Sequence, residues 1–326
     1  MSNNILDIKN LHVQYNTDDA VVHALNGLDL SLKKGEVLGL VGETGAGKTT
    51  MALSVLKLLP DKVGEITEGS INYDGLDIRK ARKSDMLKIR GAKVSMIFQD
   101  PMTSLNPIIT VGDQILEVLD LHFPDMNSDE KDKKVDEVLK LVGIQASRKS
   151  EFPHQFSGGM KQRIGIAMAL VAEPELLLAD EPTTALDVTI QAQILKLMKE
   201  LKDKFDTSMI LITHDLGVVA EFCESVAIIY SGEIIERGTI EDVFTREHNH
   251  PYTEGLFNSI PSLTCDADRL VPIPGFMADP TNLPKGCKFA ERCKYCMEKC
   301  KTNVPPAYEM GTHSIKCFLF GDKGDE

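Results

Sequence analysis

Residues 42–49 read Gly42-Glu43-Thr44-Gly45-Ala46-Gly47-Lys48-Thr49, directly after the apolar run 37–41. This order fits the G-x-x-x-x-G-K-[S/T] loop, in which the glycines let successive backbone N–H groups point at one anion. The helix that begins near Lys48 adds the positive end of its dipole. Lys48 reaches the outer phosphates and the Thr49 hydroxyl binds Mg²⁺, whereas a simple glycine turn would not need this Lys-Thr pair. We therefore predict a nucleotide-phosphate site over residues 42–50, which includes Thr50.

Length, composition and charge limit the class of protein. The chain has 326 residues, of which 42% are hydrophobic, enough for one large domain or two ordinary ones. Its formal charge of −13, from 36 basic and 49 acidic side chains, argues against nucleic acid as a partner. No apolar run is long enough to cross a bilayer, and the N-terminal sequence lacks the pattern of a signal peptide. We expect a cytosolic chain, with any membrane spans supplied by other subunits.

The pattern of apolar and polar residues predicts an α/β fold. Strands are expected at residues 5–15, 27–32, 36–41, 94–99, 175–180 and 209–213, followed by a hairpin of residues 226–230 and 233–236. Helices are expected at residues 48–59, 112–121, 128–142, 188–204 and 216–224, and from the N-cap Ser157 to about residue 171. This order predicts a mostly parallel sheet flanked by helices, with an N-terminal antiparallel β subdomain and a helical insertion over about residues 100–172.

Residues 176–181 form an apolar strand that ends in two acids, Asp180 and Glu181. By itself such a pair is usually a solvated strand end. Beside a phosphate-binding loop, Asp180 is instead placed to hold Mg²⁺, directly or through water, opposite Thr49. Glu181 is then the candidate that polarises the attacking water.

Further motifs follow in an order that resembles the ABC-type ATPases, over about residues 5–260. They are Gln99 of a Q-loop, the signature Ser157-Gly158-Gly159-Met160, the D-loop Ala185-Leu186-Asp187, and the switch histidine His214. The resemblance implies a P-loop ABC ATPase core that uses ATP and Mg²⁺. Two such domains pair head to tail, so that the glycine-rich signature turn of one caps the γ-phosphate bound by the other. Met160 departs from the family, most members of which have Gln there, and Met cannot donate a hydrogen bond.

The same resemblance implies roles for individual side chains. The expected catalytic residues are Glu181, His214 and Gln99. His214 contacts the γ-phosphate and orients the water together with Glu181, while Gln99 touches the metal or the water and reports occupancy to the helical insertion. Tyr15 falls where the family places an aromatic ring that stacks on adenine, although a strand-surface tyrosine is the alternative interpretation. Asp187 of the D-loop completes the nucleotide-binding set.

Four segments resemble the dipeptide and oligopeptide importers within this family. They are residues 98–107, 179–193, 250–253 and 272–275. The resemblance implies an ATPase subunit on the cytoplasmic face of the inner membrane, paired with a paralogous ATPase as a heterodimer, or with itself as a homodimer in isolation. Two membrane-spanning permease subunits and an extracytoplasmic substrate-binding protein would complete the importer. Nickel importers share part of this branch and are an alternative.

Two other functions are weighed against the importer. A soluble ABC ATPase that acts on DNA or ribosomes usually carries long coiled-coil insertions or two ATPase domains in one chain, and neither is visible. A regulatory module that senses nucleotide without turnover would be expected to lose Glu181 or His214, and both are present.

Six of the seven cysteines gather in a tail rich in Pro and Cys, which we place at residues 261–326, after an ATPase domain over residues 1–260. Such a tail is too short for a core of its own and needs docking, a metal, or both. The importer branch carries a C-terminal cysteine pattern that resembles a [4Fe–4S] site. The ligands that this resemblance implies are Cys287, Cys293, Cys300 and Cys317. The spacing alone also fits a Cys₄ zinc site.

Three cysteines lie outside that set. If residues 293–300 are helical, Cys296 shares one face with Cys293 and Cys300 and competes as a ligand. Otherwise Cys296 is a packing thiol. Cys223 and Cys265 are predicted to be small hydrophobic side chains.

Overall fold

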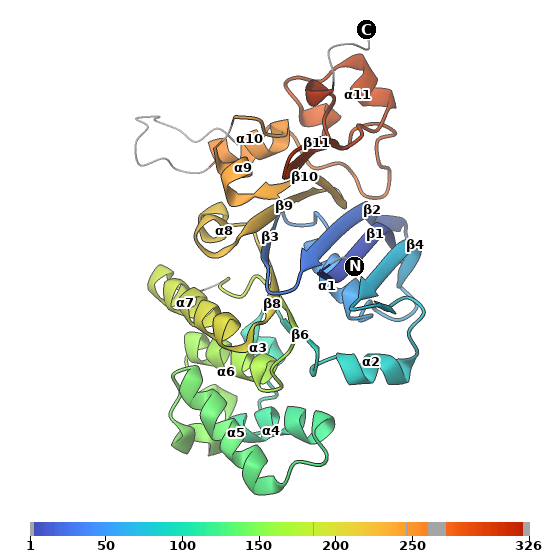
Figure 1. Ribbon diagram of the computed structural model, residues 1–326. Helices are drawn as coiled ribbons and strands as arrows, with labels where there is room; N and C mark the ends of the chain where they lie inside the picture. Colours follow the sequence, from blue (N-terminus) through green and yellow to red (C-terminus); the bar gives the residue numbers. More distant parts are fainter. Residues whose placement is uncertain (1–2, 185, 246, 260–271, 322–326) are drawn as a thin grey trace. The chain divides into compact units, whose positions relative to one another are not determined.

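The computed structural model describes residues 3–184, 186–245, 247–259 and 272–321 (Figure 1). The chain forms two compact units. The first is built mainly from Lys80–Ile212, and the second from Leu6–Ser31, Leu38–Arg79 and the residues from Thr213 onward. Within the described residues, no helix is both long and apolar enough to cross a membrane.

The first unit holds a parallel sheet that carries the acidic pair at the end of its middle strand. β6 (Val94–Ile97) pairs with β7 (Leu176–Asp180), which pairs in turn with β8 (Ser208–Thr213). Every residue of β7 is buried, which is the pattern that its three leucines predict for a strand covered on both faces. α6 (Gly158–Leu170) and α7 (Val188–Phe205) belong to the same unit.

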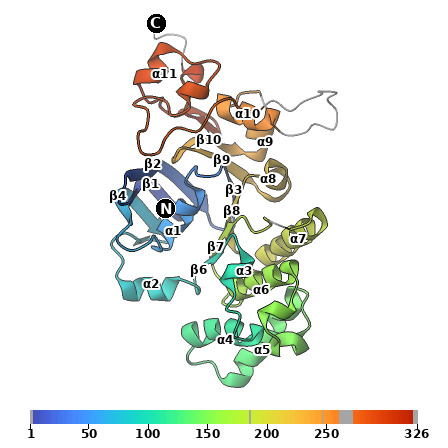
Figure 2. The same cartoon turned by 180° about the vertical axis from the view of Figure 1, so that it is seen from behind.

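The helical insertion follows β6 in the first unit, and α2 (Lys83–Ile89) precedes β6. The helices and 3₁₀ turns of the insertion before α6 are α3 (Pro101–Ser104), α4 (Val111–His122), α5 (Ser128–Leu141), η1 (Ala146–Ser150) and η2 (Pro153–Gln155). The side chains of Thr110 and Asn127 cap α4 and α5 by accepting hydrogen bonds from backbone N–H groups of the first turn. Both views show α4 and α5 beside α6 (Figures 1 and 2).

An antiparallel sheet begins the second unit. Its strands lie in the order β2 (Val21–Lys33), β1 (Asn4–Asn16), β4 (Gly64–Tyr73) and β5 (Leu76–Asp77). β1 and β4 pair antiparallel, with Ile8 opposite Ile71, and both of these side chains are buried. The sequence predicted the first two strands, while β4 and β5 escaped it because their alternation is broken by exposed polar residues.

A second group of strands in this unit carries the phosphate-binding loop and the C-terminal tail. β3 (Val37–Val41) runs parallel to β9 (Ser225–Tyr230), and β10 (Glu233–Thr239) turns back antiparallel to β9, as the predicted hairpin requires. β12 (His313–Ile315) then adds to β10, and β11 (Tyr308–Met310) adds to β12. The tail therefore docks on a sheet of the second unit.

The helices of the second unit correct two expectations. They and the 3₁₀ turns are α1 (Lys48–Val55), α8 (Leu216–Phe222), α9 (Ile240–Phe244), α10 (Pro251–Asn258), η3 (Ala290–Arg292), α11 (Glu298–Thr302) and η4 (Phe318–Phe320). The helix expected at residues 48–59 ends at Val55, because Lys57 adopts a left-handed backbone with φ +52°. Residues 293–300 are not one helix, so Cys293, Cys296 and Cys300 do not share a helix face.

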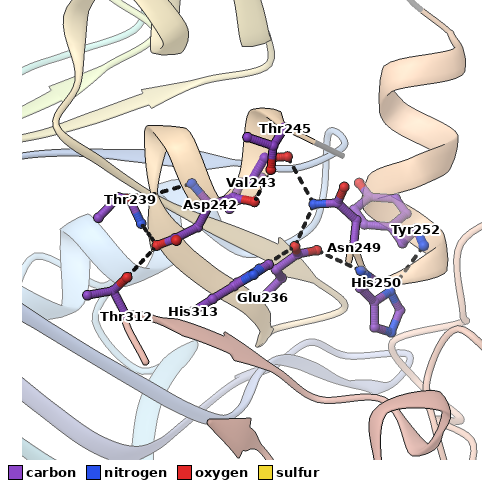
Figure 3. A network of polar contacts seen from close by, with 10 residues as sticks. All are labelled: Glu236, Thr239, Asp242, Val243, Thr245, Asn249, His250, Tyr252, Thr312 and His313. Carbon is purple, nitrogen blue, oxygen red and sulfur yellow. Dashed lines mark hydrogen bonds and ion pairs between the residues drawn. The ribbon is translucent and has the colours of Figure 1, made fainter. Parts of the chain in front are cut away.

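A buried polar network fastens the tail to the sheet (Figure 3). The Glu236 side chain, on β10, bonds His313 Nε2 of the tail at 2.8 Å and accepts from Asn249 Nδ2 at 2.8 Å and the His250 N–H at 2.9 Å. Glu236 is only 1% exposed, so these partners offset the cost of burying a carboxylate. Burial lowers the pKa of His250 to about 3, and its Nδ1 accepts from the Tyr252 N–H at the start of α10.

Candidate functional site

The phosphate-binding loop joins β3 to α1 in the second unit, as the motif predicts. A Cβ at position 42 would collide with the Ile229 carbonyl, so only glycine fits there. Gly47 takes φ +104° at the N-cap of α1, a backbone conformation that L side chains rarely adopt. Lys48 is 6% exposed and its Nζ donates to the carbonyls of Gly42 (2.7 Å) and Glu43 (3.1 Å). The lysine thus folds back over the loop that it is expected to serve.

Tyr15 lies beside this loop. Its hydroxyl and the Thr50 Oγ1 are 3.1 Å apart, which brings β1 of the antiparallel sheet to the first turn of α1. The ring is half-buried. Its position near the loop agrees with a contact to the nucleotide, while stacking on adenine stays a prediction.

His214 occupies an exposed turn immediately before α8. The turn is fixed by its neighbour, because the Asp215 side chain caps α8 by accepting from the N–H groups of Gly217 (2.8 Å) and Val218 (3.3 Å). Because His214 is exposed, its imidazole can contact a ligand without breaking any buried hydrogen bond of its own.

The acidic pair belongs to the first unit, and it gathers a second predicted residue. Asp180 ends β7 and is 2% exposed. Glu181 Oε2 accepts from Gln99 Nε2 at 3.0 Å and from Thr184 Oγ1 at 2.9 Å. Glu181 also has φ +45°, a left-handed conformation that is strained for a side chain other than glycine. The Q-loop glutamine and the proposed base are therefore held together, and Thr184 is a partner that the sequence reasoning missed.

The signature turn forms an open hollow on the first unit. Its lining includes Ser157, Gly158 and Gly159, together with Asp187 of the D-loop. Ser157 caps α6 by accepting from the Met160 N–H at 3.4 Å, and a Cβ on Gly158 would meet no atom within 4 Å. The helix N-terminus is thus exposed to an incoming anion. Ala185, between these motifs, lies outside the described residues.

Met160 packs against a cation. Its Sδ lies 3.7 Å from Arg148 Nη1, and the Arg148 guanidinium pairs with Glu151 and stacks 4.2 Å from the centre of the Phe156 ring. The thioether therefore lies against Arg148, which also contacts Phe156 just before the signature turn, and this suits a packing role.

Two family models match the chain. Residues 25–184 match the model described as ABC transporter, and residues 235–300 match the model described as oligopeptide/dipeptide transporter, C-terminal region. The chain is 46% identical to the oligopeptide transport ATP-binding protein AppD of Bacillus subtilis, over 99% of this chain and 98% of that protein. This chain belongs to the ABC transporter family. It is also 47% identical to the dipeptide transport ATP-binding protein DppD of Bacillus subtilis, over 97% and 94% of the two chains.

Solved structures confirm the fold of this ABC ATPase. One is a dimeric, post-hydrolysis state of the ATP-binding cassette MJ0796 bound to ADP and phosphate, with a TM-score of 0.65 and 29% identity over 72% of this chain and 98% of that one. Another is cbiO1 from Clostridium perfringens, with a TM-score of 0.65 and 31% identity over 76% and 92%. The P-loop ABC ATPase fold predicted from the sequence is confirmed, and the activity is ATP hydrolysis coupled to transport.

The cysteine tail of this ABC ATPase brings the four predicted thiols to one cavity. The lining of this cavity includes Cys287, Cys293, Cys300 and Cys317, along with His250 and Phe289, but not Cys296. Burial raises the pKa of Cys287 to about 12 and that of Cys317 to about 11. Neutral thiols become soft-metal ligands when a cation displaces their protons, so the residue types are those that such a cation takes. Yet among the described residues no three His, Cys, Asp or Glu side chains are close enough to hold a metal ion.

The other cysteines have different surroundings. Cys223 ends α8 and is 9% exposed, and burial raises the pKa of its thiol to about 12, as suits a packing residue. Cys296 is half-buried, and its Sγ donates to the Met297 carbonyl at 3.6 Å. Cys265 lies outside the described residues.

Two residues that approach the phosphate-binding loop were not foreseen. Arg292 bonds the Glu43 carboxylate, and the Tyr252 hydroxyl accepts from the Glu43 N–H. Arg292 is 249 positions away from Glu43 in the chain. No local sequence pattern predicts a contact at that separation. The only signal in the sequence was the positive charge of Arg292 beside Cys293, which calls for an acidic partner somewhere in the chain.

Proposed function

We propose that this ABC ATPase powers the import of dipeptides or oligopeptides. The observation that carries the proposal is similarity over almost the whole chain to peptide-transport ATP-binding proteins, including 45% identity to the oligopeptide transport ATP-binding protein OppD of Escherichia coli over 96% of this chain. The match of residues 235–300 to the peptide-transporter C-terminal region adds support that the ATPase core alone would not give.

In the proposed reaction, the residues of each unit have separate tasks. The backbone N–H groups of residues 43–50 and the Lys48 ammonium hold the phosphates, and Tyr15 contacts the adenine. Glu181, oriented by Gln99 and Thr184, takes a proton from the attacking water, which His214 helps to place against the γ-phosphate. Thr49, Asp180 and Gln99 would hold Mg²⁺, which supplies charge neutralisation on the phosphates when bound.

The signature side of the site serves a second copy of the fold. Ser157, Gly158, Gly159 and Asp187 lie in an open hollow, and the proposed occupant is the γ-phosphate bound on the partner's phosphate loop. We propose a paralogous ATPase as that partner, with a homodimer in isolation. Two membrane-spanning permease subunits and an extracytoplasmic binding protein complete the proposed importer at the cytoplasmic face of the inner membrane.

We also propose a [4Fe–4S] cluster held by Cys287, Cys293, Cys300 and Cys317 within residues 261–326, with zinc as the alternative. Support comes from the four thiols that line one cavity, from which Cys296 is absent. The group would fasten the tail when bound. Metal and acid-labile sulfide content with a visible spectrum, on anaerobically purified protein, tests this. About four irons and four sulfides per chain are expected for a cubane, whereas about one zinc and no sulfide would replace the cluster with a Cys₄ zinc site.

Uptake in cells tests the importer. A Glu181→Gln copy should abolish uptake of labelled di- and oligopeptides while leaving the protein at the membrane, because substrate delivery depends on turnover. Nickel uptake is measured in the same cells. Loss of nickel uptake with intact peptide uptake would move the protein to the nickel branch and overturn the proposal.

A further inference from the structure

The cysteine tail contacts the phosphate-binding loop directly. Arg292 precedes Cys293 in the chain, and its Nη1 and Nη2 donate to the two carboxylate oxygens of Glu43 at 3.0 and 3.1 Å. The Arg292 side chain is 6% exposed and that of Glu43 is 30% exposed. This two-pronged geometry is the strongest form of an arginine–carboxylate pair. Glu43 lies next to Gly42 at the start of the loop, so the pair ties the loop to the wall of the cysteine cavity.

Contacts other than the one with Glu43 also hold the Arg292 guanidinium in place. Its Nε donates to the Pro274 carbonyl at 3.0 Å, and its Cζ lies 5.8 Å from the Tyr230 ring centre and 5.9 Å from that of Phe289. Phe289 also lines the cysteine cavity. Arg292 therefore has little freedom, and a change in the packing of Phe289 moves the group that grips the loop.

The backbone of Glu43 is also hydrogen-bonded by a residue of the C-terminal part of the chain. The Tyr252 hydroxyl accepts from the Glu43 N–H at 2.9 Å, and the Tyr252 ring lies edge-on to Phe289 with 5.5 Å between ring centres. On its other side, the Glu43 carbonyl accepts from Lys48 Nζ at 3.1 Å. The peptide that receives the phosphate-binding lysine is thus placed by residues of the C-terminal part.

We propose that Arg292 is a positioning residue for the phosphate-binding loop, which sets nucleotide affinity through Glu43 and links that affinity to the packing of the cysteine-lined cavity. The inference rests on the nucleotide site of the proposed function and adds a regulation to it. Arg292 does not touch the nucleotide. Its effect passes through the Glu43 side chain to the loop backbone and to Lys48.

The test measures binding of a non-hydrolysable ATP analogue with Mg²⁺ to the full chain by calorimetry. Arg292→Gln should weaken binding about tenfold, because it removes a charge-assisted, two-pronged pair from the loop. Arg292→Lys keeps the charge but loses the two-pronged geometry, so its affinity for the analogue should lie between those of the unsubstituted chain and Arg292→Gln. Lys294→Gln is the matched control. That lysine also neighbours Cys293, but its ion pair with Glu254 is largely exposed, at 60% and 39%, so its analogue affinity should match the unsubstituted chain.

A double-mutant cycle separates positioning from general destabilisation. If Arg292 acts through Glu43, the pair Glu43→Gln and Arg292→Gln should bind the analogue no more weakly than the weaker single variant. Additive losses would overturn the inference, as would an Arg292→Gln affinity equal to that of the control. If Arg292→Gln fails to fold, Glu43→Gln and Arg292→Lys carry the same comparison.

Turnover of the assembled transporter gives an independent readout. A positioning role predicts a raised KM for ATP with kcat nearly unchanged in Arg292→Lys, because binding is weakened before chemistry begins. A lowered kcat with unchanged KM would overturn the inference. Absence of analogue binding to the unsubstituted chain would overturn the nucleotide site itself, so the two failures are distinguishable.

Discussion

At the scale of single residues, Glu181 has a strained backbone conformation and a carboxylate that is fixed by two hydrogen bonds. Its φ is positive, and Gln99 and Thr184 both donate to the same carboxylate oxygen. We expect Glu181→Gln to lower the ATPase kcat at least a hundredfold while analogue affinity is kept, since a general base contributes about 10²–10⁴ in rate. Thr184→Val should lower kcat less, because Gln99 still orients the oxygen. Wild-type turnover by Glu181→Gln would show that another group is the base.

The thiols offer a second test at this scale. Burial raises the pKa of Cys223 to about 12. At pH 9, about one Cys223 thiol in a thousand is therefore ionised to the reactive thiolate. Alkylation at pH 9, resolved by mass spectrometry, should therefore modify the half-buried Cys296 well before Cys223. Cys223 should react only when the chain is unfolded in denaturant. Equal rates for the two thiols in the folded protein would contradict the packing role of Cys223.

At the scale of elements, the N-cap of α6 allows the structural role of Ser157 to be distinguished from its proposed role in phosphate binding. Ser157 is exposed and its bond to the Met160 N–H is long, at 3.4 Å. Ser157→Ala should lower the free energy of unfolding by about 1 kcal/mol or less, the range of a helix cap. If the turn binds a partner's phosphate, ATPase of the assembled transporter should fall much further than this loss of stability explains. Denaturant unfolding and steady-state hydrolysis, measured on one preparation, check the difference; a proportionate loss of both would leave Ser157 as a cap alone.

The elements also show where sequence reasoning succeeds. β3 and β7 were predictable because a strand buried on both faces must be apolar throughout, and a phosphate loop or an acidic pair marks where each ends. β11 and β12 span three residues each, too few for any periodicity to show. The contact of Arg292 with Glu43 joins residues 249 positions apart, a separation at which no local pattern operates. The boundary near residue 260 and the roles of the nucleotide-site residues stay predictions, because partners and ligands decide them.

At the scale of the whole molecule, the chain carries two complementary half-sites, and this argues for a nucleotide-dependent dimer. Ser157 and Asp187 line the open hollow, and a phosphate bound on another copy's loop would be stabilised there by the N-terminus of α6. Dimerisation then adds contacts only when ATP is present, so nucleotide shifts the population toward the closed pair. Because Glu181→Gln is expected to slow hydrolysis, this variant with ATP and Mg²⁺ should elute as a dimer, and with ADP as a monomer.

Light scattering during size exclusion measures that mass, and Ser157→Arg in the Glu181→Gln background is the control. An arginine fills the hollow that the phosphate would occupy, so the double variant should stay monomeric with ATP while its own phosphate loop still binds the analogue. A dimer that persists in the double variant, or that forms equally with ADP, would mean that the pairing does not pass through the signature turn. The proposed paralogous partner, added at equal concentration, should then be tested in place of the homodimer, since a heterodimer would use this turn from only one side.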